Sequence, residues 1–128
     1  MRSCDEPPPP LLLSGIEQFN RGEFFEQHET LELLWRAERR KIRRLYQGIL
    51  QIGVAFHHLR RLNYHGTIYM LTRGPQYLTP FAPRCQRVDV ESLLAAAAAA
   101  RREVERLGPS RLADFDWRLV PTVRLVSS

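Results

Sequence analysis

The segment 49–59 constrains the fold more than any other stretch of this chain, because a helix with its sequence is apolar on almost every side. We predict that it forms the middle of a helix spanning 42–62. A helix that is apolar all round is packed on two sides, as the central helix of a bundle is. Gly53 costs about 1 kcal/mol relative to alanine inside a helix, so its presence indicates a close crossing with a second helix.

Two helices are predicted before the central one. Ser14 and Glu17 have the spacing of a capping box, so the first helix is expected to begin at Ser14 and to end at the turn 20–22. The next helix spans 23–38, with acidic residues near its start and arginines near its end, as the helix dipole favours. A run of four prolines precedes this region. Because such a run favours an extended chain, residues 1–13 are predicted to form a flexible tail.

Two more helices are predicted after the central one. The first spans 66–78, and Pro75 is expected to kink or divide it, because proline lacks an N–H donor and clashes with the preceding turn. The second spans 90–107 and is expected to end at Gly108, which a proline follows. No strand pattern is strong enough to predict a sheet. We therefore predict an all-α fold, a compact bundle of about five helices in one domain over 14–128, with an extended C-terminal tail.

The composition is that of an ordinary globular protein, with 44% apolar and 26% charged residues. No stretch approaches the roughly 18 uninterrupted apolar residues of a membrane span, so no membrane association is expected. Cys4 and Cys85 are the two cysteines, and neither belongs to a C-x-x-C pair. We interpret both as free thiols, which favours a location in the reducing cytoplasm.

A basic cluster lies between the second predicted helix and the central one. Six basic residues fall within nine positions: Arg36, Arg39, Arg40, Lys41, Arg43 and Arg44. Together with the formal net charge of +5, this cluster makes nucleic acid a possible partner, since arginines grip phosphates. No aromatic interleaving or recognition helix accompanies it. Nearly all the basic residues are arginine, which favours compositional bias and a solvated helix junction.

A polar motif lies within the helix predicted over 23–38. His28 and Glu32 are one turn apart, and Trp35 follows a turn later, so all three fall on the stripe expected to face the core. Buried charge is costly unless it is paired. We therefore expect a buried polar centre in which His28 and Glu32 bond to Gln47, Gln51 or an arginine.

An alternative interpretation of the same motif is a metal site. His28-Glu29-x-x-Glu32 differs by one residue from the H-E-x-x-H pattern of zinc peptidases. Carboxylates also bind divalent metals, and His58 on the central helix is the best third ligand. In this alternative the chain is a metal-dependent hydrolase with a divalent metal cofactor and Glu29 as a base. The hydrogen-bonded network without a cofactor is favoured, and whether the chain is an enzyme stays open.

Three segments follow one pattern: F-N-x-G-E-F-F-E-x-H-E-x-L-E-x-x-W over 19–35, Q-G-x-x-Q over 47–51 and H-L-x-R-x-N-x-x-G over 58–66. This pattern resembles the bacterial and archaeal domain-of-unknown-function family 309, whose hallmark is H-x-x-x-E-x-x-W. The resemblance implies a compact all-helical fold and no established activity. Carried over by position, the motif residues are His28, Glu32 and Trp35, with Gln47, Gln51, His58 and Asn63 as their neighbours.

These observations together favour a small cytoplasmic domain with a binding or structural role and no enzymatic activity. Its partner is expected to be a small ligand or another protein, which the sequence does not identify. A homodimer through an exposed apolar helix face is also expected, because symmetric dimers are the commonest oligomers.

Overall fold

The computed structural model describes residues 2–127, and most of the described chain is helical. Its α-helices are α1 (Pro10–Asn20), α2 (Phe24–Ala37), α3 (Arg43–Arg60), α4 (Tyr64–Leu78) and α5 (Val90–Leu107). Short 3-10 helices are η1 (Arg2–Asp5), η2 (Thr79–Phe81), η3 (Pro109–Asp114) and η4 (Trp117–Leu119), and the strands are β1 (Arg84–Cys85) and β2 (Val88–Asp89). The predicted all-α bundle is confirmed.

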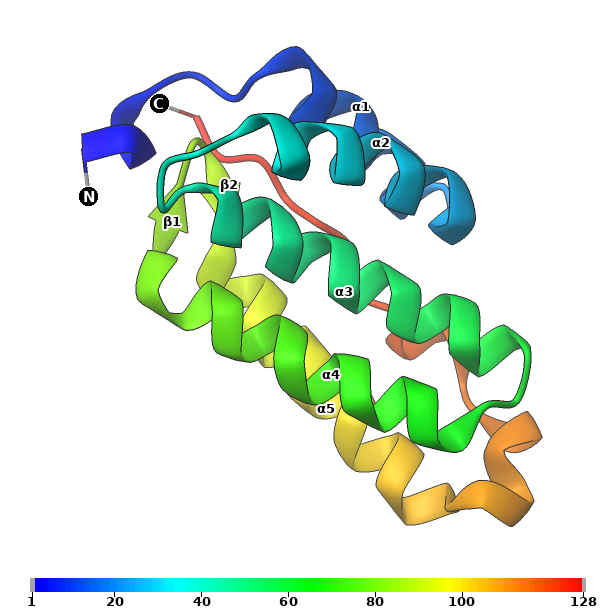
Figure 1. Cartoon of the computed structure of the whole chain (residues 1–128). Helices are drawn as coiled ribbons and strands as arrows, with labels where there is room; N and C mark the ends of the chain where they lie inside the picture. The colour runs from blue at the N-terminus through cyan, green and yellow to red at the C-terminus, as the bar shows by residue number, and fades with distance from the viewer. Residues whose placement is uncertain (1, 128) are drawn as a thin grey trace.

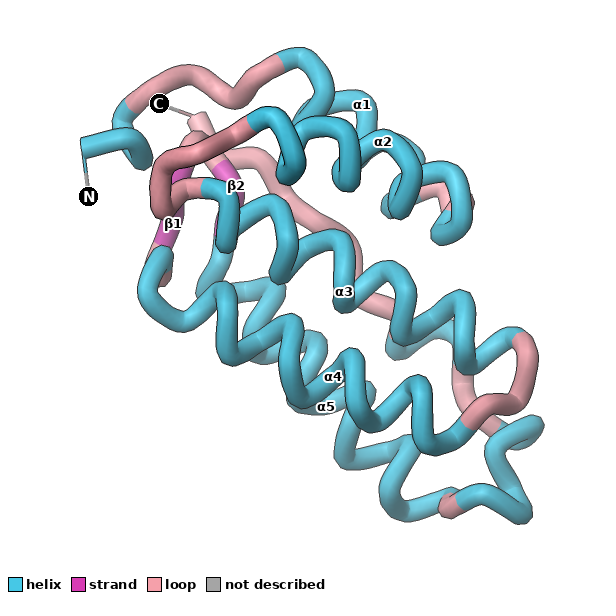
Figure 2. Tube along the Cα trace, in the orientation of Figure 1, coloured by secondary structure: helices cyan, strands magenta, loops and turns pink. Residues whose placement is uncertain are grey.

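The helices α2, α3 and α4 lie side by side, with α1 behind α2 and α5 behind α4 (Figure 1). The C-terminal segment, red in Figure 1, runs along the rear of α3. Asn20 anchors this segment, because its amide donates to Val123 O at 2.9 Å and accepts from Val123 N at 2.8 Å. Both ends of the described chain lie near the β-hairpin, at one end of the helical body (Figure 2).

The central position of α3 follows from its sequence. Ile49, Ile52 and Phe56 are all fully buried, as the apolar segment 49–59 predicts. Small residues let the neighbouring helices come close: Gly48 lies against α4, where an added β-carbon would meet Gly74 O at 2.9 Å. On the other side, Gly53 lies against α2, so the close crossing predicted from this glycine is confirmed.

The predicted bounds of α2, α3 and α5 agree with the structure to within two residues at most ends. Asp89 caps α5 by accepting a hydrogen bond from Ser92 N at 3.0 Å, and Gly108 ends it with a positive φ of 68°. The expected division of the fourth helix is wrong, because α4 continues through Pro75. Leu71 and Leu78 are buried, so both halves of α4 are held in the core. The free energy of burying them outweighs the loss of the one hydrogen bond that proline cannot make.

The start of the first helix is a second correction. α1 begins at Pro10, four residues before Ser14, and no side chain caps it. Proline suits the first turn of a helix, because its N–H would have no partner there and its φ is already helical. Leu12 is fully buried, so the chain joins the core within the stretch predicted as a flexible tail.

The N-terminal arm, residues 2–9, is fastened to the β-hairpin. Cys4 and Cys85 form a disulfide, which contradicts the prediction of two free thiols. Gln86 N donates to Cys4 O at 2.8 Å, and Gln86 Oε1 accepts from the buried Tyr46 hydroxyl at 2.8 Å. The argument for the cytoplasm from free thiols therefore fails, and that location stays a prediction.

The β-hairpin itself was not predicted. β1 and β2 pair antiparallel, with Arg84 opposite Asp89. The turn between them places Gln86 and Arg87 at positive φ angles of 47° and 67°. Glycine and asparagine usually occupy such positions, so this turn carries no sequence signal. Within residues 2–127, no helix has the length and apolar character needed to cross a membrane.

Candidate functional site

The predicted motif residues lie on the two packed helices α2 and α3. They are His28, Glu32 and Trp35 of α2 and Gln47, Gln51 and His58 of α3, all of them partly buried. We call this set, together with Arg43 of α3, the outer face. The spacing within each helix is three, four or seven residues, which keeps each set on one stripe. Across the two helices, the Arg43 guanidinium lies over the Trp35 ring, 5.0 Å from its centroid.

The prediction that the motif forms a buried polar centre is therefore wrong, because its residues are less buried than expected. The side chains of His28 and Glu32 are 39% and 28% exposed. The stripe of α2 that faces the core is rotated from the predicted one and consists of Phe24, Gln27, Leu31 and Leu34. The motif residues lie beside this stripe and are only partly buried.

An imidazole, a carboxylate and a guanidinium follow one another along α2 on the outer face. His28 Nε2 lies 3.3 Å from one carboxylate oxygen of Glu32, and Arg36 Nη2 lies 2.6 Å from the other. The three residues follow at spacings of four, so they are neighbours on the helix surface. Exposed pairs of this kind contribute only about 0.3–0.5 kcal/mol each to stability. The pair with Arg36 offsets the charge of the Glu32 carboxylate.

Several polar atoms at the contact between α2 and α3 lack partners. Trp35 Nε1 is shielded from solvent, and no group within residues 2–127 accepts a hydrogen bond from it. The same holds for the donor Arg43 Nε and the acceptor Gln51 Oε1. A buried polar atom without a partner costs about 1–3 kcal/mol, so each such atom needs an explanation. Both donors belong to one stacked pair, Trp35 and Arg43.

Gln27 is a site residue that the motif did not identify. It is fully buried on the inward stripe, and its Nε2 donates to Leu50 O at 3.1 Å and to Phe24 O at 3.3 Å. Its Oε1 has no partner within the described chain. The available signal in the sequence was its position three residues after Phe24, on the same helix face, whereas its contact with Gly53 is visible only in the structure. Gln27 bridges the two helix backbones directly behind the outer face.

His58 and Asn63 lie together at the end of α3. Asn63 Oδ1 accepts from Gly66 N at 2.9 Å and so caps α4, while Asn63 Nδ2 lies 3.4 Å from His58 Nδ1. Burial lowers the pKa of His58, and the nearby His57 and Arg61 lower this pKa further. The imidazole is therefore neutral at pH 7.

The three metal ligands of the alternative interpretation, His28, Glu32 and His58, do not form a cluster that could hold a metal ion. Among residues 2–127, no group of three histidine, cysteine, aspartate or glutamate side chains could hold a metal ion. His58 lies instead against Gly66, where an added β-carbon would meet its ring at 2.8 Å. Glu29, the base in that interpretation, is exposed on α2. The neighbours His28 and Glu32 remain a pair.

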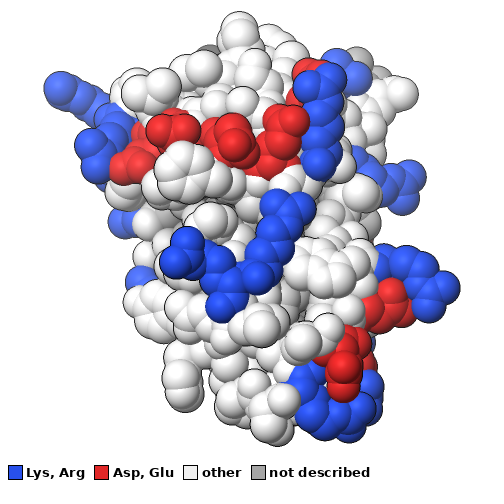
Figure 3. Space-filling model, turned by 90° about the vertical axis from the view of Figure 1, so that its right-hand side faces the viewer, with Lys and Arg blue, Asp and Glu red and all other residues white. Residues whose placement is uncertain are grey.

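The basic cluster is largely engaged within the chain. Its members with defined contacts are Arg36 with Glu32, Arg40 with Glu6 and Glu38, Arg43 with Trp35, and Arg44 with Gln47 and Tyr77. On the side of the molecule shown in Figure 3, basic side chains lie in several separate groups, some of them next to acidic ones. A continuous basic stripe, which is typical of a nucleic-acid interface, is not visible on this side.

The fold and the outer face together define a class: a small all-α domain of two consecutive helical hairpins, α1–α2 and α3–α4, with a polar surface where the hairpins meet. Residues 12–70 match the model of one family, described as Domain of unknown function (DUF309). This match confirms the resemblance seen in the sequence, and it covers a segment that contains every motif residue. No curated protein matches the chain.

Proposed function

We propose that this chain is a non-enzymatic binding domain whose outer face takes a ligand with an oxyanion group, either a carboxylate or a phosphate. The observation that carries the proposal is the pair of unpartnered donors in the stack of Trp35 on Arg43. Two N–H groups beside a positive charge match the acceptor oxygens of an anion. A bound anion would satisfy both donors and offset their desolvation.

The charges around the stack support the same ligand class. The carboxylate of Glu32, three residues before Trp35 on this face, is already paired with Arg36 and lies 3.3 Å from His28 Nε2. Arg43 stacks on an indole and has no ion pair within residues 2–127. Its charge is therefore available to an incoming anion, and the partly apolar surroundings strengthen the attraction.

The two indole N–H groups of the chain allow a direct test, because Trp35 and Trp117 are its only tryptophans. We would titrate ¹⁵N-labelled protein with sodium phosphate and with sodium acetate, against sodium chloride of equal ionic strength. The Trp35 signal, assigned with Trp35→Phe, is expected to shift and saturate with at least one of the two oxyanions. Arg43→Gln should abolish the shift, whereas the control Arg39→Gln should retain it.

The opposite results are equally clear. If neither anion moves the Trp35 signal beyond the chloride control, the outer face does not bind oxyanions. A saturating shift that persists in Arg43→Gln would place the anion elsewhere and would also overturn the proposal. In both cases the motif would retain only its contribution to the packing of α2 on α3.

A further inference from the structure

A recess lies where the end of α3 faces η3 and η4. It has a volume of about 530 Å³ and is lined by Leu59, Arg60, Leu62, Leu112, Ala113 and Trp117. Sites for small molecules typically measure about 300–1,000 Å³, so the recess has the size for one. None of these residues belongs to the outer face.

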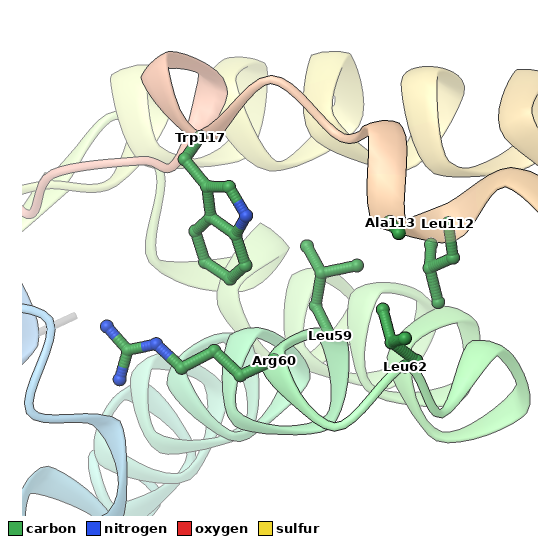
Figure 4. Close-up of a pocket in the computed structure, with 6 residues that line it drawn as sticks. All are labelled: Leu59, Arg60, Leu62, Leu112, Ala113 and Trp117. Atoms are coloured by element: carbon green, nitrogen blue, oxygen red, sulfur yellow. The ribbon is translucent and has the colours of Figure 1, made fainter.

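The recess is chemically divided. Figure 4 shows Arg60 and Trp117 at one end and Leu62, Leu112 and Ala113 at the other, with Leu59 between them. Apart from the guanidinium, its lining side chains are apolar or aromatic. A ligand that fits this arrangement has an apolar body and a negative group at one end.

Arg60 is held in place without an acidic partner. Its guanidinium lies 4.8 Å from the centroid of the Phe24 ring and 5.7 Å from that of Trp117, and Nη1 donates to Gly22 O at 2.6 Å. No carboxylate among residues 2–127 pairs with it. The guanidinium carries five N–H donors, so the position is fixed while donors remain free for a carboxylate.

Leu62 is a separate observation at the apolar end. This residue has a positive φ of 56° and its side chain is 56% exposed. A left-handed conformation costs a residue with a β-carbon roughly 1–2 kcal/mol, and glycine would avoid that cost. Here the conformation places a large apolar side chain on the rim of the recess. Trp117, at the opposite end, is also 42% exposed.

We propose that this recess is a binding site for a small free monocarboxylate with an apolar or aromatic body. The carboxylate would pair with Arg60, and the body would lie over Leu59 between Trp117 and Leu62. The single positive charge favours one carboxylate over a more highly charged anion. This proposal is independent of the outer face, because it rests on other residues and on the other tryptophan.

The test uses Trp117 fluorescence in a Trp35→Phe background, where it is the only indole. Phenylacetate is compared with phenylacetamide, which has nearly the same shape and no charge. We expect saturable binding of phenylacetate, with a Kd about 10-fold lower than that of the amide. This ratio corresponds to a difference of about 1.4 kcal/mol in binding free energy. Arg60→Gln should remove this difference and leave amide binding unchanged. The neighbouring exposed Arg61 is the matched control, and Arg61→Gln should preserve the difference.

A second variant tests the recess itself without touching Arg60. Ala113 is exposed on the rim, so Ala113→Phe should fill the space without disturbing the core, and binding of both probes should be lost. The proposal is overturned if phenylacetate does not saturate, if the amide binds as tightly, or if Ala113→Phe leaves binding intact. Because oxyanion binding at the outer face is monitored at Trp35, either proposal can fail while the other stands.

Discussion

The Gln27 side chain occupies the space that a β-carbon on Gly53 would need. We expect Gly53→Ala to destabilise the protein, because overpacking costs about 1–3 kcal/mol and the gain in helix propensity is about 1 kcal/mol at most. In a Gln27→Ala background the same substitution should cost less or even stabilise. Urea unfolding of the wild type, both single variants and the double variant measures this coupling. If the changes in the free energy of unfolding caused by the two substitutions were strictly additive, the close contact between Gln27 and Gly53 would be contradicted.

His58 gives the protein a defined sensitivity to acid. Its pKa is lowered from an ordinary value of 6.5, so the unfolded chain takes up this proton at a higher pH than the folded protein does. The neutral imidazole therefore contributes fully above about pH 6.5, and this contribution is lost as the pH falls toward the lowered pKa.

The measurement compares the free energy of unfolding at about pH 7.5 and about pH 5.5 for the wild type and for His58→Gln. The glutamine stays neutral over this range, so the variant should lose less stability on acidification. Carboxylates titrate in both proteins and cancel in the comparison. An equal loss in both proteins would show that the environment of His58 does not oppose its protonation.

The spacing of the motif predicts which of its residues share one stripe of α2, and whether they form one site with the residues of α3 stays a prediction. Helical periodicity places His28, Glu32 and Trp35 on one stripe whatever surrounds them. The depth of burial could not be predicted, because it depends on how α2 is rotated against α3. That rotation is set by close contacts such as Gln27 on Gly53, which pair residues 26 positions apart in the sequence.

Among the elements, the helices with clear caps and a regular apolar period were predicted well. α5 has the bounds expected from Asp89 and Gly108. Two elements were missed for different reasons. The run of prolines favours an extended chain, although its last member, Pro10, suits the first turn of a helix and begins α1. The hairpin turn uses Gln86 and Arg87 at positions where glycine is common, so the sequence carries no turn signal there.

The disulfide between the N-terminal arm and the β-hairpin is expected to stabilise the fold. It joins residues that are 81 positions apart, and a bond across so long a loop restricts the unfolded chain strongly. We expect reduction, or the paired substitution of Cys4 and Cys85 by serine, to lower the free energy of unfolding by about 2–4 kcal/mol.

Thermal unfolding with and without dithiothreitol checks this expectation. The wild type should lose stability in the reductant, and the double serine variant should not respond to it. Two titratable thiols in unreduced, unfolded wild-type protein would contradict the disulfide.

At the scale of the whole molecule, two apolar residues of α2 are exposed on the surface. Phe25 and Leu33 are 54% and 64% exposed and lie about two turns apart. We propose that the chain forms a homodimer through this side of α2, since an isologous contact uses the same patch on both copies. Leu33→Glu should yield monomers in sedimentation velocity experiments.

Leu119 on η4 provides the control, because it is also exposed and lies on a different element. Leu119→Glu should leave the dimer unchanged. A monomeric wild type, or a dimer that survives Leu33→Glu, would exclude this interface.

The bond between Cys4 and Cys85 also makes a covalent ring out of the first two thirds of the chain. The family segment 12–70 and all of α1 to α4 lie inside that ring. A protease that cuts one turn between these helices therefore opens the backbone without separating the pieces. A pulling force applied at both ends crosses the sulfur bridge and bypasses the enclosed helices. Under tension, α5 and the segments after it extend, while the helices that carry the outer face bear no load.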